Sequence, residues 1–197
     1  MKLEQWFPTP IWYGVYENIR ETQYTSAIKY CNELATNHPG RTLSNIGGWQ
    51  SDDLYYVNLI DTPLQIYIDE IRPRVKAALL ELGVKSNYDI FNIWININYK
   101  GCRNVLHNHA GASLSGVFYL TENNSEIVFR RALDINTYCL ESMDSDKDTF
   151  LSSDIVKYTP QQGQYMIFPP WLKHEVSTNN DDNERISIAF NVKKVYD

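Results

Sequence analysis

The stretch of sequence that decides the fold is residues 90–99, IFNIWININY. It is rich in β-branched and aromatic residues, and its side chains alternate with a period of two, Ile93, Ile95 and Ile97 against Trp94, Asn96 and Asn98. This alternation predicts a β-strand that buries one face. Further runs predict strands near residues 113–120, 125–131, 136–141, 154–158, 164–168, 173–177 and 185–193. Short strands at this spacing favour an antiparallel barrel or a double-sheet jelly roll.

The residues before this stretch follow a helical period instead. Apolar side chains recur every three or four residues over 21–36, and a second helical stripe begins at Thr62 and ends at Gly83. Pro73 lies inside the second predicted helix and is expected to kink it. Residues 40–53, which contain two consecutive glycines, are predicted to form a loop. Two helices followed by many strands indicate an α+β fold, mainly β, with the helices packed on one sheet.

The length of 197 residues, without a low-complexity linker, favours a single domain over 1–197. We expect residues 1–86 to supply helical support and an edge strand, and residues 87–197 to form the jelly-roll core. The edge strand is predicted within 5–16, where two prolines interrupt residues that favour strands. An edge of this kind could pair between subunits, so a homodimer is one expectation.

Composition and charge exclude several classes of partner. The chain has 18 Lys and Arg against 24 Asp and Glu, a net charge of −6, which argues against a nucleic-acid partner and against docking on an anionic membrane. No apolar run reaches the roughly 18–20 residues of a membrane-spanning helix, and residues 1–14 lack the apolar stretch of a secretion signal. The three cysteines are widely spaced and predict neither a disulfide framework nor a zinc site. These features predict a cytoplasmic protein.

Two of the four histidines are separated by a single residue. If residues 105–109 are extended, His107 and His109 point to the same face and could bind one metal ion. His174, in a predicted late strand, could complete a three-ligand site that leaves other coordination positions open. Surface histidines, or hydrogen-bonded core histidines, would give the same spacing, so the motif alone leaves both interpretations open.

Arg185 begins the last predicted strand. Antiparallel pairing of residues 185–190 with 173–177 would bring Arg185 to the same end of the barrel as His174. A guanidinium directed into a barrel needs an anion, and its two parallel donors suit a carboxylate. The alternative is an arginine that pairs with a surface Asp or Glu.

The order of these motifs resembles the Fe(II)/2-oxoglutarate-dependent dioxygenases, in particular their prolyl-hydroxylase-like branch and a group of 2OG-Fe(II) oxygenases of marine bacteria and phages. The resemblance spans nearly the whole chain. Its segments are FPTPIW (7–12), GGWQSDDL (47–54), NIW (92–94), HNH (107–109), LSGVFYL (114–120), FPPWLKHEV (168–176) and RISIAFN (185–191). It implies a double-stranded β-helix, which is a jelly roll with supporting helices, in agreement with the predicted order of elements.

The resemblance implies an iron site with a departure from its usual ligands. His107 corresponds to the first Fe(II) ligand and His174 to the last, whereas the position two residues after the first is usually Asp or Glu and here is His109. Three neutral histidines would leave a charge of +2 on the centre, where a carboxylate leaves +1, and should hold an anionic cosubstrate more firmly. In the other interpretation His109 does not ligate, and water or substrate takes its place.

Further residues correspond to the 2-oxoglutarate site of that family. Arg185 lies eleven residues after His174, where related enzymes hold the distal carboxylate, and Ser187 shares its strand face. Tyr119 corresponds to a tyrosine on the same carboxylate, and Tyr99 resembles another pocket tyrosine. The implied activity is that of a 2-oxoglutarate-dependent oxidoreductase. Such a dioxygenase uses O2 to hydroxylate a C–H bond of a small-molecule or protein substrate and releases succinate and CO2.

Two other classes of function fit the same residues. A cupin-like metalloprotein with three histidines would not use 2-oxoglutarate, and Arg185 would then be structural. A non-catalytic binding module that kept the fold would bind neither metal nor 2-oxoglutarate. Three tryptophans are predicted either to wall a pocket or to pack in the core, namely Trp49, Trp94 and Trp171.

Overall fold

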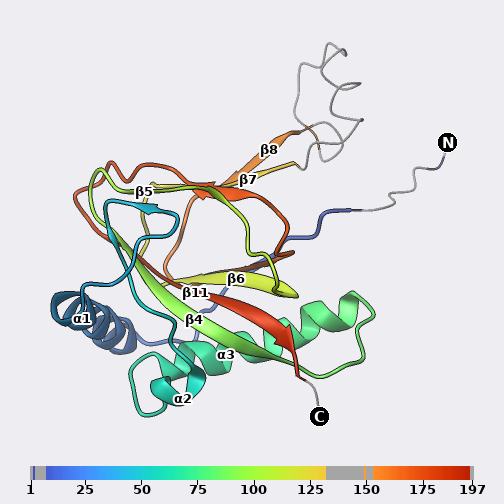
Figure 1. Ribbon diagram of the computed structural model, residues 1–197, viewed down its shortest axis with the longest axis horizontal. Helices are drawn as coiled ribbons and strands as arrows, with labels where there is room; N and C mark the ends of the chain where they lie inside the picture. Colours follow the sequence, from blue (N-terminus) through green and yellow to red (C-terminus); the bar gives the residue numbers. More distant parts are fainter. Residues whose placement is uncertain (1, 3–7, 132–148, 150–152, 196–197) are drawn as a thin grey trace.

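The computed structural model describes residues 2, 8–131, 149 and 153–195, and shows two β-sheets with helices on one side (Figure 1). The predicted strand near 136–141 lies outside the described residues. In chain order the elements are β1 Trp12–Val15, α1 Glu21–Asn37, β2 Asn45–Ile46, β3 Trp49–Gln50, α2 Tyr56–Leu59, α3 Gln65–Glu81, β4 Tyr88–Asn98, β5 Arg103–His107, β6 Leu114–Tyr119, β7 Ile127–Arg130, β8 Ile155–Tyr158, β9 Gln164–Phe168, β10 His174–Val176 and β11 Arg185–Lys194.

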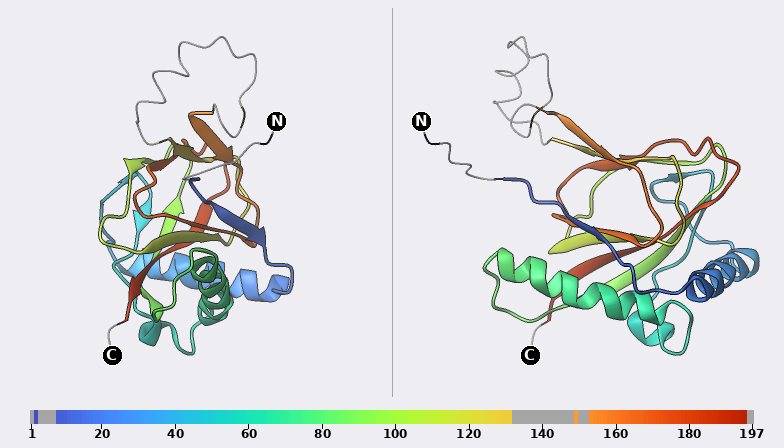
Figure 2. Two further views of the ribbon diagram at one scale, coloured as in Figure 1. Left: turned by 90° about the vertical axis from the view of Figure 1, so that its right-hand side faces the viewer. Right: turned by 180° about the vertical axis from the view of Figure 1, so that it is seen from behind.

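The two sheets form the double-stranded β-helix that the sequence predicts. The six-stranded sheet has the order β1-β9-β6-β11-β4-β3, and the five-stranded sheet has the order β2-β5-β10-β7-β8. Neighbouring strands in both sheets are antiparallel. Helices α1 and α3 lie on the outer side of the six-stranded sheet, so the five-stranded sheet faces its other side (Figures 1 and 2).

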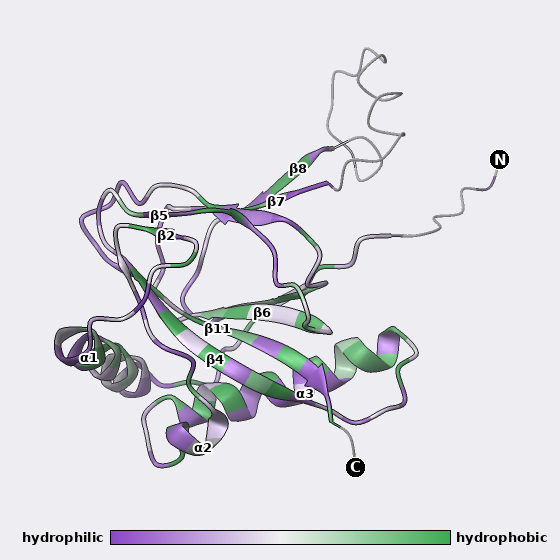
Figure 3. Ribbon diagram, viewed as in Figure 1, coloured by the Kyte–Doolittle hydropathy of each residue, from purple (hydrophilic) through white to green (hydrophobic). Residues whose placement is uncertain are grey.

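Strands β4 and β11 bury different residues on their two faces, and hydrophobic and hydrophilic residues alternate along both in Figure 3. On β11 the even-numbered residues, such as Ile186 and Phe190, belong to the largest hydrophobic cluster together with buried side chains of α1 and α3. The odd-numbered residues from Arg185 to Asn191 line a cavity between the sheets. Each buried Ile or Phe stabilises the fold by about 1.5–3 kcal/mol, so the outer face provides stability while the inner face is free to carry polar groups.

One predicted strand pairing is wrong. Residues 173–177 were expected to pair with 185–190, but β10 pairs with β5 and β7, whereas β11 pairs with β4 and β6. The chain changes sheets between β9 and β10 and again between β10 and β11. Arg185 and His174 nevertheless line the same cavity, because they approach it from opposite sheets.

The N-terminal part contains short elements that the sequence did not indicate. The predicted loop 40–53 includes β2 and β3, and α2 follows it. The two longer helices agree with their predicted stripes, although α3 begins at Gln65, after Thr62. The amide of Val84 donates to Leu79 O beyond Gly83, which has a φ of 73° and ends the helix. Strand β1 lies at one edge of the six-stranded sheet. Within the part of the chain that the structure describes, no helix has the length and apolarity needed to cross a bilayer.

Candidate active site

Three histidines meet on the inner side of the five-stranded sheet. His107 ends β5, His174 begins β10, and the two are directly opposite in the strand register. His109 lies two residues beyond β5, outside any strand, where its amide N–H donates to Pro170 O at 2.8 Å. One nitrogen from each ring lies within 4.8 Å of the others. The predicted convergence therefore occurs, but His109 reaches the group from a loop rather than from an extended strand.

Backbone carbonyls orient two of these rings. His107 Nδ1 lies 2.8 Å from Val105 O, and His174 Nδ1 lies 2.9 Å from Leu172 O. A carbonyl only accepts, so both Nδ1 atoms carry the proton, and each Nε2 presents a lone pair. Metal-binding histidines are commonly fixed in this way.

Burial keeps all three imidazoles neutral near pH 7. Burial, together with the proximity of His107, lowers the pKa of His109 to about 4 and the pKa of His174 to about 3. Burial also lowers the pKa of His107, although its hydrogen bond to Val105 O opposes the shift. Neutral imidazole is the form that binds metals, so the site needs little deprotonation before a cation can enter.

The donor set fits a divalent transition metal. His109 Nε2 lies 3.2 Å from His174 Nε2. Two nitrogens that each bind one ion at about 2.1 Å, at right angles, are about 3.0 Å apart. Imidazole suits iron, cobalt, nickel and zinc, and no carboxylate belongs to this group among the described residues.

Arg185 lies on the opposite wall of the cavity without an acidic partner. Arg185 is only 2% exposed, and none of the ion pairs among the described residues includes it. Its Nη2 donates a long hydrogen bond of 3.5 Å to the Tyr119 hydroxyl, and its Nε has no partner in the described part of the chain. A buried cation without a counter-ion is costly, so this guanidinium indicates a binding site for an anion.

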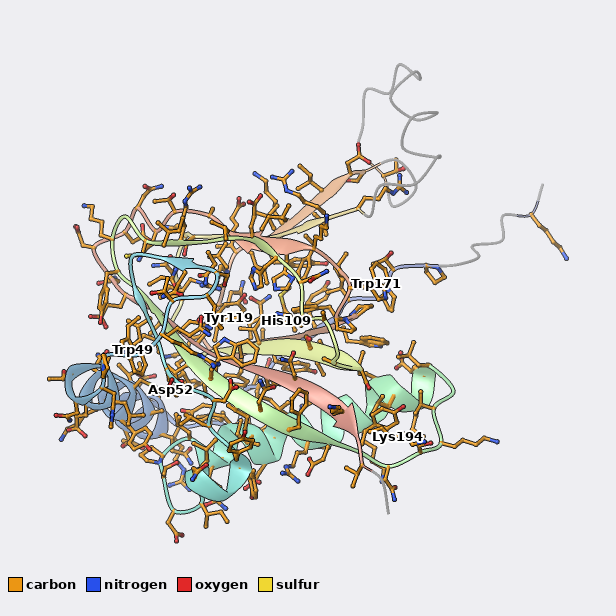
Figure 4. The ribbon with its side chains drawn as sticks, in the orientation of Figure 1. Trp49, Asp52, His109, Tyr119, Trp171 and Lys194 are labelled. Carbon is orange, nitrogen blue, oxygen red and sulfur yellow. The ribbon has the colours of Figure 1, made fainter. Side chains whose placement is uncertain are left out.

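Two hydroxyl groups extend this anion site. Ser187 Oγ is buried and lacks a partner among the described residues, and Ser187 lies opposite Tyr119 in the strand register. Burial raises the pKa of Tyr119, while the Arg185 charge opposes the shift, so the phenol stays protonated and can donate a hydrogen bond. Figure 4 shows Tyr119 and His109 between the two sheets. The structure therefore brings Arg185, Ser187 and Tyr119 together as one group of donors.

A single cavity of about 490 Å³ contacts both groups. Its lining includes all three histidines, Arg185 and Ser187. Tyr99 is not brought to it, since this residue follows the end of β4 and is 40% exposed. Of the tryptophans, Trp94 lines the cavity, Trp49 packs in the main core, and Trp171 is 50% exposed (Figure 4).

Most of the polar lining was not among the predicted site residues. The cavity is lined by six carboxamides, from Gln50, Asn92, Asn96, Asn104, Asn108 and Asn191. Arg41 and Asp53, which form an ion pair, line it as well. The signal was present for Asn92 and Asn96, because asparagine alternates with isoleucine along β4.

The fold and this site define a class of protein, the metal-dependent oxygenases built on a double-stranded β-helix. Residues 92–191 match the family model described as "Putative 2OG-Fe(II) oxygenase", about half of the chain, and this region contains the three histidines and Arg185. The chain belongs to this family of 2OG-Fe(II) oxygenases. It is therefore a 2-oxoglutarate-dependent oxygenase, an enzyme of a family that uses Fe(II) and 2-oxoglutarate. The family resemblance seen in the sequence is confirmed.

Solved structures confirm the fold. A prolyl-4-hydroxylase from Pseudomonas putida is 12% identical, with 95% of this chain and 94% of that chain covered and a TM-score of 0.67. The non-heme alpha ketoglutarate dependent epimerase SnoN from nogalamycin biosynthesis is 13% identical, with coverage of 94% and 79% and a TM-score of 0.64. The viral collagen prolyl hydroxylase of Paramecium Bursaria Chlorella virus-1 is 13% identical, with coverage of 93% and 96% and a TM-score of 0.57. No curated protein sequence matches the chain.

Proposed function

We propose that this oxygenase is a dioxygenase that hydroxylates a C–H bond of a small-molecule or protein substrate and releases succinate and CO2. The observation that carries the proposal is the buried Arg185, which has no acidic partner among the described residues and faces the same cavity as the three histidines. In a family that uses 2-oxoglutarate, the second carboxylate of the cosubstrate is the anion that suits this guanidinium.

In this proposal His107, His109 and His174 hold Fe(II). The carbonyls of Val105 and Leu172 fix the tautomers of two of them, so that Nε2 is the ligand atom. The chemistry that Fe(II) supplies when bound is activation of O2, with which 2-oxoglutarate is decarboxylated and a substrate C–H bond is hydroxylated.

The other residues bind and orient the cosubstrate. Arg185 donates two parallel hydrogen bonds to the distal carboxylate, and the hydroxyls of Ser187 and Tyr119 donate to its remaining lone pairs. Phe168, whose ring centroid is 4.8 Å from that of His174, and Trp94 limit the access of water to the histidines.

The proposal is tested by anaerobic calorimetry, in which 2-oxoglutarate is titrated into the Fe(II)-loaded protein. We expect binding that requires both the metal and Arg185, with Arg103→Ala as a control because Arg103 is an exposed arginine of β5. On admission of O2, mass spectrometry should detect succinate at a slow rate even without substrate. A protein that binds Fe(II) but neither binds nor consumes 2-oxoglutarate would instead be the three-histidine metalloprotein of the cupin type.

A further inference from the structure

The cavity has two ends along strands β4 and β11. Arg185 lies opposite Asn98 at one end, and Asn191 lies opposite Asn92 at the other. Arg185 and Asn191 are six residues apart on one strand, so their Cα atoms are about 20 Å apart. A five-carbon dicarboxylate bound to Arg185 is too short to reach Asn191. The polar groups at the second end therefore have no role in binding 2-oxoglutarate.

Trp94 separates the two ends and lies beside the histidines. On β4 it lies between Asn92 and Asn96 on the same face, and opposite Ala189 of β11. Its ring centroid is 5.5 Å from the centroid of His109. The second end of the cavity thus begins next to the proposed metal ligands. A molecule bound there would have carbon atoms close to the group that carries out the oxidation.

The second end has no unpaired permanent charge. Apart from Arg185, the described residues that line the cavity include two with a permanent charge, Arg41 and Asp53, and these pair with each other. Asn92 Nδ2 also donates to Asp53 Oδ1 at 3.3 Å, so this carboxylate receives hydrogen bonds from two side chains. A carboxylate or an ammonium that entered this end would lose its hydration without meeting an opposite charge that is free.

The facing asparagines leave one acceptor and one donor without a partner. Asn92 Oδ1 is buried and has no hydrogen bond within the described residues. Asn191 Oδ1 accepts a hydrogen bond of 2.6 Å from Ser115 Oγ, which leaves the Nδ2 donors of Asn191 without a partner in the described chain. Side chains directly opposite in a sheet are close neighbours. One ligand group that both donates and accepts a hydrogen bond could therefore satisfy both asparagines.

We propose that the end of the cavity beyond Trp94 is the substrate subsite, and that it takes an uncharged small molecule bearing a hydroxyl or an amide group. Asn92 accepts a hydrogen bond from this group and Asn191 donates one to it. The identification of this molecule as the substrate rests on the proposed function, because that function places 2-oxoglutarate at the Arg185 end and the reactive centre beside Trp94.

The test uses four short probes of similar size and ligand-observed saturation-transfer NMR. The probes are butyramide, 1,2-butanediol, butyrate and butylammonium. We expect butyramide, butanediol or both to bind to the wild-type protein, and the two charged probes not to bind at this end. Asn92→Leu and Asn191→Leu should each weaken the binding about fivefold or more, the effect of losing about one hydrogen bond. Asn37→Leu, at the exposed end of α1, is the control and should leave the binding unchanged.

Several results would overturn the inference. It fails if neither neutral probe binds, or if neither leucine variant weakens their binding. It also fails if the two leucine variants weaken the binding of butyrate or butylammonium as strongly as they weaken the binding of the neutral probes. The two variants are assayed separately, and circular dichroism shows which of them fold, so one well-folded variant is sufficient. Binding of Mn(II) is measured separately by its EPR signal. If the wild-type protein does not bind Mn(II), the proposed function is contradicted. The probe experiment tests the role of the two asparagines whether or not a metal is bound, so the two failures can be distinguished.

Discussion

The two sheets that enclose the cavity hold their functional side chains in different ways. Arg185 and Ser187 lie on β11, which is ten residues long and pairs along its length with the eleven-residue β4. His107 and His174 lie at the ends of β5 and β10, which are five and three residues long. His109 lies on no strand.

This difference separates a preformed anion site from a metal site that the metal itself would reinforce. The six-stranded sheet is backed by α1 and α3 through the main hydrophobic cluster, so Arg185 is held whether or not a ligand is present. A metal ion would add a link between β5, β10 and the loop at His109. These two strands are short, and their pairing is irregular between His174 and Val176. Substitutions on the six-stranded sheet should therefore leave metal binding on the five-stranded sheet intact.

The largest effect is expected for His174→Ala. It removes the most buried of the three imidazoles and should lower the affinity for Fe(II) or Co(II) about 100-fold or more. Anaerobic calorimetry measures this affinity, and His38→Ala at the exposed end of α1 serves as the control. Wild-type metal affinity in His174→Ala would show that the three histidines do not form a metal site.

The next largest effect is expected for Arg185→Ala on the opposite sheet. Loss of a charge-assisted pair is worth about 2–4 kcal/mol, so 2-oxoglutarate should bind about 30- to 1000-fold more weakly, while metal affinity stays the same. Since Arg185 has no acidic partner among the described residues, the substitution should not lower the melting temperature of the ligand-free protein. Unchanged affinity for 2-oxoglutarate would remove this residue from the cosubstrate site and favour the cupin-type alternative.

In the metal-free protein, the buried His174 of the five-stranded sheet should make the free energy of unfolding depend on pH. The pKa of His174 is lowered to about 3 by burial, against an ordinary value near 6.5, so the unfolded chain binds more protons than the folded one below pH 6.5. The contribution of the neutral His174 ring to the free energy of unfolding is therefore fully present above pH 6.5 and is lost as the pH falls toward 3. Between pH 7 and pH 5 the free energy of unfolding should fall by about 2 kcal/mol from His174 alone.

Urea denaturation at several pH values measures this dependence. His174→Asn should flatten it, because asparagine does not titrate, whereas His38→Asn should leave it unchanged. Equal slopes for wild type and His174→Asn would contradict the burial of a neutral imidazole on the five-stranded sheet.

The regular parts of the fold were predictable because their sequence repeats. The alternation of Ile93, Ile95 and Ile97 identified β4, and the stripes over 21–36 and from Thr62 identified α1 and α3. Strands β2 and β3 are two residues long, and α2 is four, so none contains enough of a period to be recognised. The sheet partner of β10 was predicted wrongly, because strands that are neighbours in sequence need not share a sheet, and the chain crosses from one sheet to the other over residues 177–184 between β10 and β11.

The part of the candidate site that was predictable is the part whose residues belong to recognisable sequence motifs. The spacing of His107 and His109 left a metal site as one of two interpretations, the family resemblance added His174 as a ligand, and the structure brings the three together. Alternation placed Ser187 on the face of Arg185, as observed. The Arg41–Asp53 pair was not predictable, because it joins a loop to the segment beyond β3 and no period relates the two.

The smallest effect, and the one most specific to this chain, is expected for His109→Asp. Aspartate restores the ligand type usual in such sites and should retain metal binding, whereas His109→Ala should weaken it strongly. The added negative charge lowers the net charge of the centre from +2 to +1, which reduces its attraction for the 2-oxoglutarate dianion. We expect the affinity for 2-oxoglutarate to fall about tenfold, or about 1.4 kcal/mol.

Titrations of Co(II) and then of 2-oxoglutarate into the three proteins separate these effects. If His109→Ala binds metal as well as wild type does, His109 is not a ligand, and the loop that carries it only shields the site. If His109→Asp binds 2-oxoglutarate more tightly than wild type, the charge of the centre does not govern cosubstrate affinity, and the Arg185 wall alone determines it.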